Sequence, residues 1–241
     1  MWARFLLFLL TSAPCHGQET HWNNNLWLQY FGDHPIGTNG WGVHLEGQLR
    51  LADMGNRWQQ ILFRPGVNYS INPSVMLSVG YCFLESYPYG DSPALAHQVP
   101  INDSWEQVLW RADCLGLRWV QRFRLEQRWI GVAGRQPGGD WEVQSWRYEN
   151  RFRYLLRTTI PIKKQSPWYV AVWDEVFINF GENVYRNQFS QNLAVVALGR
   201  KLSKTVNLEV GYMLQTHQRR GGRVWEQNNT VLVSLFSTTP F

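Results

Sequence analysis

The side chains best suited to chemistry in this sequence are arginines and carboxylates that recur at every second position. They are densest in LRWVQRFRLEQRWI, residues 117–130, where one parity holds Arg118, Arg122, Arg124, Glu126 and Arg128. The other parity holds Trp119, Phe123, Leu125 and Trp129. A period of two predicts a strand with one charged and one apolar face. Guanidinium groups suit buried bidentate ion pairs with carboxylates, so we expect the charged face to pack inside the molecule.

The same parity rule, applied along the chain, predicts an interior with more cations than anions. The interior arginines are Arg50, Arg64, Arg111, Arg118, Arg122, Arg124, Arg128, Arg147, Arg151, Arg153, Arg157 and Arg200. The carboxylates that face them are Glu46, Asp113, Glu126, Glu149, Glu175 and Glu209. Two interpretations stay open. Interlocking ion pairs could close a narrow interior, or the surplus cations could attract anionic solutes in a water-filled pore, because uncompensated buried charge is costly.

The segment WDEVFIN, Trp173 to Asn179, is the most distinctive local cluster. Strict alternation places Glu175 and Asn179 inside but Asp174 outside near mid-height, where its carboxylate would face lipid. A β-bulge would relieve this conflict. We expect Glu175 to anchor the arginine ladder. The alternative is a catalytic carboxylate.

Catalytic and metal signals are otherwise weak. The histidines His21, His34, His44, His97 and His217 lie at strand starts or in connections and are predicted to be polar rim residues. No GxSxG, HExxH or paired-cysteine metal spacing occurs. We therefore predict no catalytic residue, metal or cofactor. Cys82 and Cys114 fall on different strands, so no disulfide is expected.

The elements that must position these side chains are alternating runs separated by turn signals. The ten predicted strands are Trp41–Leu51, Gln59–Tyr69, Val75–Phe83, Gln107–Asp113, Leu117–Ile130, Arg147–Ile160, Trp168–Phe180, Asn192–Arg200, Val206–Gln215 and Thr230–Phe236. Leu26–Phe31 is an eleventh candidate, expected to fold inward or lie in the periplasm. If it spans, twelve strands would be needed.

The predicted connections alternate in length. Short ones lie at 70–74, 114–116, 161–166 and 201–205, longer ones at 88–102, 131–145 and 216–227, and a medium one at 181–187. The short turn Asp53–Asn56 is an exception on the side of the long connections. Alternating lengths are typical of bacterial outer-membrane barrels.

The apolar face of residues 117–130 has the dimensions of a membrane-spanning strand. Trp119 and Trp129 lie ten residues apart, about 23 Å along the axis of a barrel whose strands tilt by about 45°. The apolar band of such barrels is about 25 Å tall and is bordered by aromatic girdles. The sequence therefore predicts an all-β, antiparallel transmembrane β-barrel of ten strands, or of twelve, with Trp119 and Trp129 in the girdles.

The ends and the composition agree with export. Residues 1–17 have the parts of a signal peptide, with Arg4, an apolar run and small residues before a cleavage site after Gly17. Cys15 follows a poor acylation sequence, which disfavours a lipid anchor. Residues 18–241 are predicted to form a single domain without a stretch long enough for a membrane helix. The formal charge of +5 does not favour nucleic-acid binding, because an export signal and regular apolar faces accompany it.

Five segments together resemble a bacterial family of unknown function: RPGVNY at 64–69, Gly80-Tyr81, RLEQR at 124–128, WDEVFIN at 173–179 and Gly211-Tyr212. The RPGxxY and WDExFxN motifs carry most of the resemblance. The resemblance implies an outer-membrane β-barrel and supplies no activity to carry over to this chain. The pattern of the strands is porin-like. In the family, Gln-Asn is usually followed by arginine, whereas this chain has Leu193.

The sequence thus predicts a protein of the Gram-negative outer membrane, either a narrow channel or a structural barrel with an arginine-rich lumen. The alternatives are an enzyme that modifies lipid or lipopolysaccharide and a soluble barrel carrier. Strand length and polar interior parity disfavour the carrier. The expected partners are outer-membrane lipid and lipopolysaccharide, small anionic solutes and the barrel-assembly machinery, with no nucleic acid.

Overall fold

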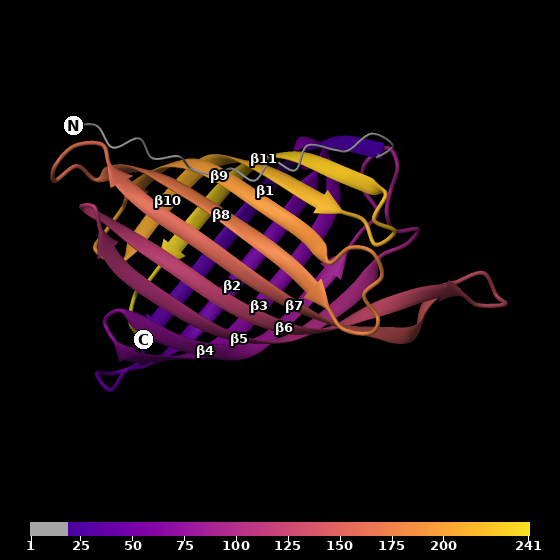
Figure 1. The fold of residues 1–241 in the computed structure, drawn as a ribbon, viewed down its shortest axis with the longest axis horizontal. Coiled ribbons are helices and arrows are strands. Elements are labelled where there is room, and N and C mark those ends of the chain that lie inside the picture. Colours follow the sequence, from indigo (N-terminus) through magenta and orange to yellow (C-terminus); the bar gives the residue numbers. More distant parts are fainter. Residues whose placement is uncertain (1–18) are drawn as a thin grey trace.

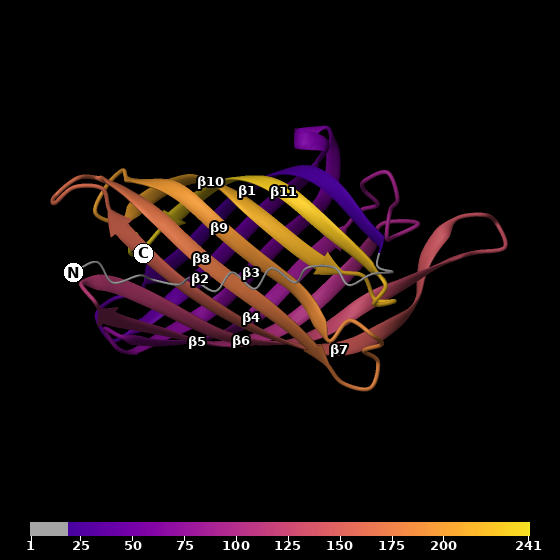
Figure 2. The same ribbon diagram turned by 45° about the horizontal axis from the view of Figure 1, so that its top comes forward.

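The strands close into one barrel in the computed structural model, which describes residues 19–241. The predicted signal peptide lies outside the described residues. Around the barrel the strands run in the order β1-β11-β10-β9-β8-β7-β6-β5-β4-β3-β2, so each is hydrogen-bonded to its neighbours in sequence (Figures 1 and 2). Among residues 19–241, no helix has the length and apolar character needed to cross a membrane.

Within residues 19–241, eleven strands build the wall. They are β1 (Glu19–Pro35), β2 (Trp41–Ala52), β3 (Arg57–Asn72), β4 (Val75–Ser86), β5 (Val99–Cys114), β6 (Leu117–Arg135), β7 (Trp141–Pro161), β8 (Trp168–Phe180), β9 (Phe189–Lys201), β10 (Val206–Gln218) and β11 (Val224–Ser237). A short 3-10 turn, η1 (Asp53–Gly55), joins β2 to β3.

The predicted count of ten strands is wrong, and so is the expectation that a spanning Leu26–Phe31 would require twelve. This segment is the centre of β1, which pairs antiparallel with β2 and parallel with β11. Successive strands alternate in direction, so the first and last of an odd number run the same way. One parallel ladder therefore closes the barrel with eleven strands.

The pairing register shows that the strands are strongly tilted. A path can be traced around the barrel from each residue to its pairing partner on the next strand. A path that starts at Pro161 on β7 returns to β7 at Arg147, fourteen residues away. A stagger of this size corresponds to a tilt of about 40°. The diagonal course of the strands is visible in Figures 1 and 2.

The two rims differ in their connections. At the short-turn rim, β3–β4 and β5–β6 are joined by residues 73–74 and 115–116. The long-loop rim carries residues 87–98 and 181–188 and the β6–β7 hairpin, which projects beyond the other connections (Figure 1). Part of the predicted long connections is strand, because β6, β7, β10 and β11 extend beyond the expected bounds.

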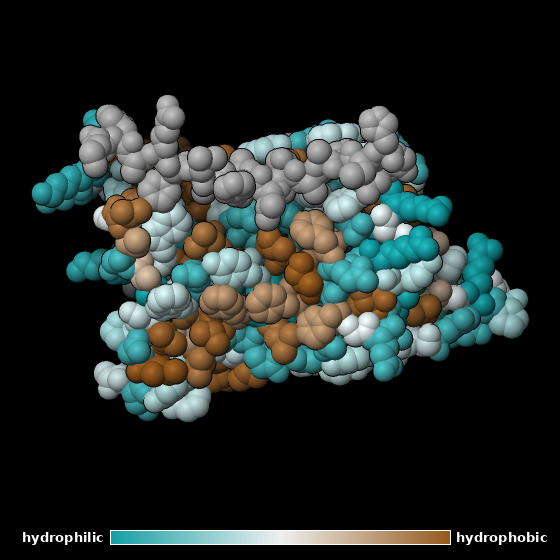
Figure 3. Space-filling view, in the orientation of Figure 1, coloured by the Kyte–Doolittle hydropathy of each residue, from teal (hydrophilic) through white to brown (hydrophobic). Residues whose placement is uncertain are grey.

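The outer face is largely apolar between the rims. Phe63, Val79, Phe83, Val196 and Val210 are each about half exposed and point away from the lumen. Apolar side chains gather over the outer surface of the strands, whereas hydrophilic ones concentrate along the β6–β7 hairpin (Figure 3). Such an exterior lacks the polar cover of a soluble protein.

Aromatic side chains border this face at both rims. Trp41 and Trp168 begin strands at the short-turn rim, where Trp110 lies opposite Val75. Trp119 is on the same side, in the outward parity of β6, and its Nε1 donates to the Cys114 carbonyl at 3.2 Å. Farther along the barrel, Trp22, Trp58 and Trp129 are outward and exposed.

Candidate functional site: the barrel interior

The centre of the lumen is crossed by a network of buried ion pairs. Glu126 accepts hydrogen bonds from Arg153 at 2.7 Å and from Arg64 at 3.3 Å. Arg64 also donates to Glu46 at 2.7 Å, and Arg124 lies 3.6 Å from Glu46 and 4.0 Å from Glu126. All five side chains are buried. Arginines of β3, β6 and β7 thus converge on carboxylates of β2 and β6.

Glu175 is a second node, on β8. It accepts from Arg122 at 2.8 Å and from Arg153 at 2.9 Å, so Arg153 bridges Glu126 and Glu175. Closer to the short-turn rim, Arg157 pairs with Glu209, which also accepts from the Tyr169 hydroxyl. Both hydrogen bonds to Glu175 are accepted by the same carboxylate oxygen, Oε1.

Toward the long-loop rim the arginines find different partners. Arg128 pairs with Asp103 at 3.2 Å and Arg147 with Glu149 at 2.6 Å. Arg151 donates only to neutral groups, the Asn179 amide oxygen at 2.9 Å and the Ser190 hydroxyl at 3.2 Å.

Three interior guanidinium groups have no carboxylate within ion-pair distance among residues 19–241. Besides Arg151 they are Arg50 and Arg111. Arg50 donates to Gln48 at 2.9 Å, and its guanidinium carbon lies 3.9 Å from the centre of the Trp27 ring. The interior therefore has more cations than the carboxylates neutralise.

Two of the arginines expected inside lie elsewhere. The Arg118 side chain is 66% exposed at the short-turn rim and pairs with Asp113 at 3.1 Å, so neither joins the interior network. Arg200 points outward and lies over the Trp168 ring. The interior parity of β9 is that of Leu193 and Val195, which leaves Arg200 on the opposite face.

Asp174 faces outward, as its parity predicts, but the proposed bulge does not turn it inside. The irregularity lies farther along, between Phe177 and Ile178. Asp174 instead accepts two hydrogen bonds from the Asn192 amide, at 2.9 and 3.1 Å. On the same outer face, Gln127 donates to Glu106 at 3.1 Å.

His44 corrects the prediction that every histidine is a rim residue. It is buried in the lumen, 2.8 Å from Asp33 and 3.6 Å from Glu46. Within the described part of the chain, no Ser, Thr or Cys hydroxyl or thiol is hydrogen-bonded to it. No group of three or more His, Cys, Asp or Glu side chains in residues 19–241 is arranged to hold a metal.

The two cysteines within residues 19–241 are free. Cys82 is buried beneath Trp105 and Leu62, whereas Cys114 is exposed at the short-turn rim.

The loop between β4 and β5 folds into the barrel mouth, a feature that the sequence did not indicate. The Tyr89 hydroxyl donates to Glu226, which also accepts from Arg219 at 2.6 Å. Burial, together with the Glu226 charge, raises the pKa of Tyr89, so it stays protonated and keeps donating. Arg219 also donates to the Ser92 carbonyl and so fixes the loop.

Among residues 19–241, the lumen contains a loop-side chamber and a turn-side chamber. The loop-side chamber has a volume of about 490 Å³ and is lined by Arg128, Arg147, Arg151 and Tyr89 among others. The turn-side chamber has a volume of about 230 Å³ and reaches to Arg111 and Phe236. Arg50 and Arg153 line both, so the central ion-pair network separates them.

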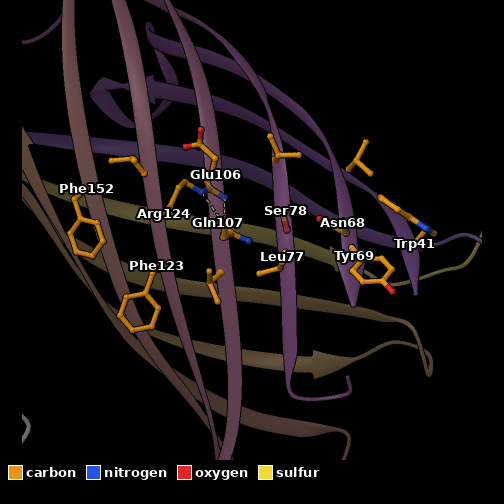
Figure 4. A pocket seen from close by; sticks show the side chains of 14 residues that line it. Trp41, Asn68, Tyr69, Leu77, Ser78, Glu106, Gln107, Phe123, Arg124 and Phe152 are labelled. Carbon is orange, nitrogen blue, oxygen red and sulfur yellow. Dashed lines mark hydrogen bonds between the residues drawn. The ribbon is translucent and has the colours of Figure 1, made fainter. Parts of the chain in front are cut away.

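A third hollow, of about 640 Å³, lies on the outer face across β2 to β7. Figure 4 shows Leu77, Phe123 and Phe152 along it, with Glu106 at its edge. Arg124 and Gln107, whose hydrogen bond is drawn, belong to the interior face of the same strands. This hollow is part of the apolar outer surface and is separate from the lumen.

The closed, tilted barrel with an apolar exterior and a charged lumen defines a porin-like β-barrel. A solved structure of the NanC porin has the same fold, with a TM-score of 0.50 and 13% identity, over 87% of this chain and 90% of that one. The chain belongs to the family described as "Protein of unknown function (DUF2490)", whose model matches residues 24–227. An uncharacterized protein of Methylorubrum extorquens is 27% identical over 196 residues, 79% of this chain and 78% of that protein.

Proposed function

We propose that this protein is a narrow, non-enzymatic channel of the bacterial outer membrane that favours small anions. The observation that carries this proposal is the surplus of interior cations. Arg50, Arg111 and Arg151 face the chambers without a carboxylate partner in the described part of the chain. Rings of charged side chains set the sign of the ion that a pore admits, and unpaired buried guanidinium groups are stable only where water or anions reach them.

The exterior supports a membrane location. Its half-exposed apolar side chains would contact outer-membrane lipid and lipopolysaccharide, and the barrel-assembly machinery would insert the barrel. The mature protein is expected to require detergent and to show heat-modifiable gel mobility. Recovery as a soluble monomer from a periplasmic extract would contradict this location.

Trp119 and Trp129 are proposed to lie in the two interfacial girdles. Spin labels at these two positions should report interfacial depth, and a label at Leu125 should report the hydrocarbon centre. Equal water exposure at all three positions would reject this orientation.

Single-channel recording in a planar bilayer tests the channel itself. Arg151→Glu reverses a lumen charge without breaking an ion pair, since its hydrogen-bond partners are Asn179 and Ser190. We expect the selectivity to move toward cations. The matched control is Arg118→Glu at the exposed rim, where water screens the charge. An unchanged selectivity in Arg151→Glu would contradict an anion-selective lumen.

The central ion-pair network favours a second candidate, a closed structural barrel. In that case the double variant Arg122→Glu and Arg151→Glu should leave the conductance at zero. It should also destabilise the barrel by about 3–5 kcal/mol for the broken Arg122–Glu175 pair. An open channel would instead show changed selectivity, so the two outcomes differ in kind.

A further inference from the structure

The turn-side chamber has two unlike walls. On β5, β6 and β7 it is lined by Arg111, Arg122 and Arg157, whereas β9 and β11 contribute Val195 and Leu232. A barrel lumen that conducts water and ions is normally polar all around. Here a wall rich in arginine, which we call the cationic wall, faces an apolar one across a space of about 230 Å³. The carboxylates Asp33, Glu46, Glu175 and Glu209 also line the chamber and are outnumbered by its arginines.

The apolar wall is extensive. Leu193, Val195 and Ala197 follow one another at every second position of β9 and are buried inside the barrel. Leu232 and Met213 extend the same surface across β11 and β10. Trp173 packs against this cluster and also lines the chamber.

The cationic wall keeps unused donors. One terminal nitrogen of Arg122 donates to Glu175, but its buried Nε has no hydrogen-bond partner in the described residues. Arg111, which lines the same chamber, has no ion pair at all within the described residues. A buried donor without a partner costs free energy unless a ligand or water meets it.

We propose that the turn-side chamber binds a small amphiphilic carboxylate. Its carboxylate would contact Arg122 and Arg111, and its apolar body would lie against Val195, Leu232 and Trp173. The chamber is somewhat smaller than pockets for drug-sized ligands, which hold about 300–1,000 Å³, so the body is a single aromatic ring or a short alkyl chain. The inference rests on the proposed channel function and names the class of anion that it favours.

Binding to the detergent-solubilised full barrel tests this class directly by calorimetry. The probes are benzoate, acetate and benzyl alcohol, which separate the apolar body from the charge. We expect benzoate to bind at least tenfold more tightly than either of the others, because only benzoate meets both the arginines and the apolar wall. A tenfold difference corresponds to about 1.4 kcal/mol of binding free energy. Equal affinity for benzoate and acetate, or for benzoate and benzyl alcohol, would overturn the proposal.

A matched pair of variants locates the site. Val195→Thr keeps the side-chain shape but adds a hydroxyl to the apolar wall, and Val196→Thr makes the same change on the outer face, where Val196 is 50% exposed. Benzoate affinity should fall several-fold in Val195→Thr, with acetate unchanged, and should stay the same in Val196→Thr. Equal effects of the two variants would place binding elsewhere and overturn the proposal.

Conductance separates this inference from the channel function. If chloride passes selectively but benzoate shows no preference over acetate, the channel function stands and the amphiphilic site is wrong. If benzoate binds as expected but the barrel never conducts, the site stands and the channel function is wrong.

Discussion

The two halves of the lumen follow different packing rules. Along β2 to β7, arginines and carboxylates from different strands reach one another, and the Arg64–Glu126 contact crosses from β3 to β6. Along β8 to β11, apolar side chains such as Leu193 and Leu232 pack together, and Glu175, Glu209 and Glu226 are the buried charges in those strands. Long cations on one wall and short apolar groups on the other fill a narrow cylinder while leaving two chambers.

The largest expected effect comes from removing a node of the charged half. Glu126→Gln keeps the shape of the side chain but leaves Arg64 and Arg153 with one fewer anion. Breaking such buried pairs costs about 3–5 kcal/mol, because the remaining charges are uncompensated. Urea unfolding followed by gel mobility should show this loss. A variant as stable as the wild type would mean that water reaches the network and screens the remaining charges.

The apolar half should respond less strongly. Leu232→Ala removes buried methyl groups from the cluster and should cost about 2–3 kcal/mol, at the low end for such substitutions because the adjacent chamber lets the site relax. The same unfolding assay measures it. If Leu232→Ala lowered the free energy of unfolding more than Glu126→Gln does, the expectation that the charged half is the more sensitive one would be wrong.

A smaller effect of opposite sign is expected on the outer face. Asp174→Val replaces a carboxylate on the outer face by an apolar residue, at the cost of its hydrogen bonds from Asn192. We expect a stabilisation of about 1 kcal/mol in lipid bilayers, because charged groups on this face are unfavourable at mid-depth. A loss of stability would show that this face contacts a polar partner rather than lipid.

The smallest effect belongs to the rim. Arg118→Gln removes an ion pair whose partners are both mostly exposed. Its cost should stay below about 0.5 kcal/mol, the usual value for surface pairs. A cost close to that of Glu126→Gln would show that exposure does not separate rim pairs from lumen pairs in this barrel.

Local alternation predicted the faces of individual strands well where the two faces differ in chemistry. In β6, arginines and glutamate alternate with Trp, Phe and Leu, and the structure places Arg124, Glu126 and Arg128 inside. In β9 both faces are apolar, since Leu193 and Val195 alternate with Ala194 and Val196. The period of two therefore carries no information about orientation there, and this is why parity predicts the wrong face for Arg200.

Closure and pairing could not be predicted in this way. Strand number depends on whether β1 meets β11, two segments at opposite ends of the chain, and only their ladder in the closed barrel settles it. The same holds for the folded-in β4–β5 loop, whose Tyr89 reaches Glu226 on β11.

The sequence by itself determined that this chain forms long two-faced strands with an arginine-rich interior. That information is local, because successive side chains of a strand point to opposite faces. Only the tertiary structure decided that eleven strands close the barrel and that Arg153 bridges Glu126 and Glu175. It also decided that an apolar wall faces the cations. Partners across a lumen are set by barrel tilt and stagger, which are properties of the whole closed sheet.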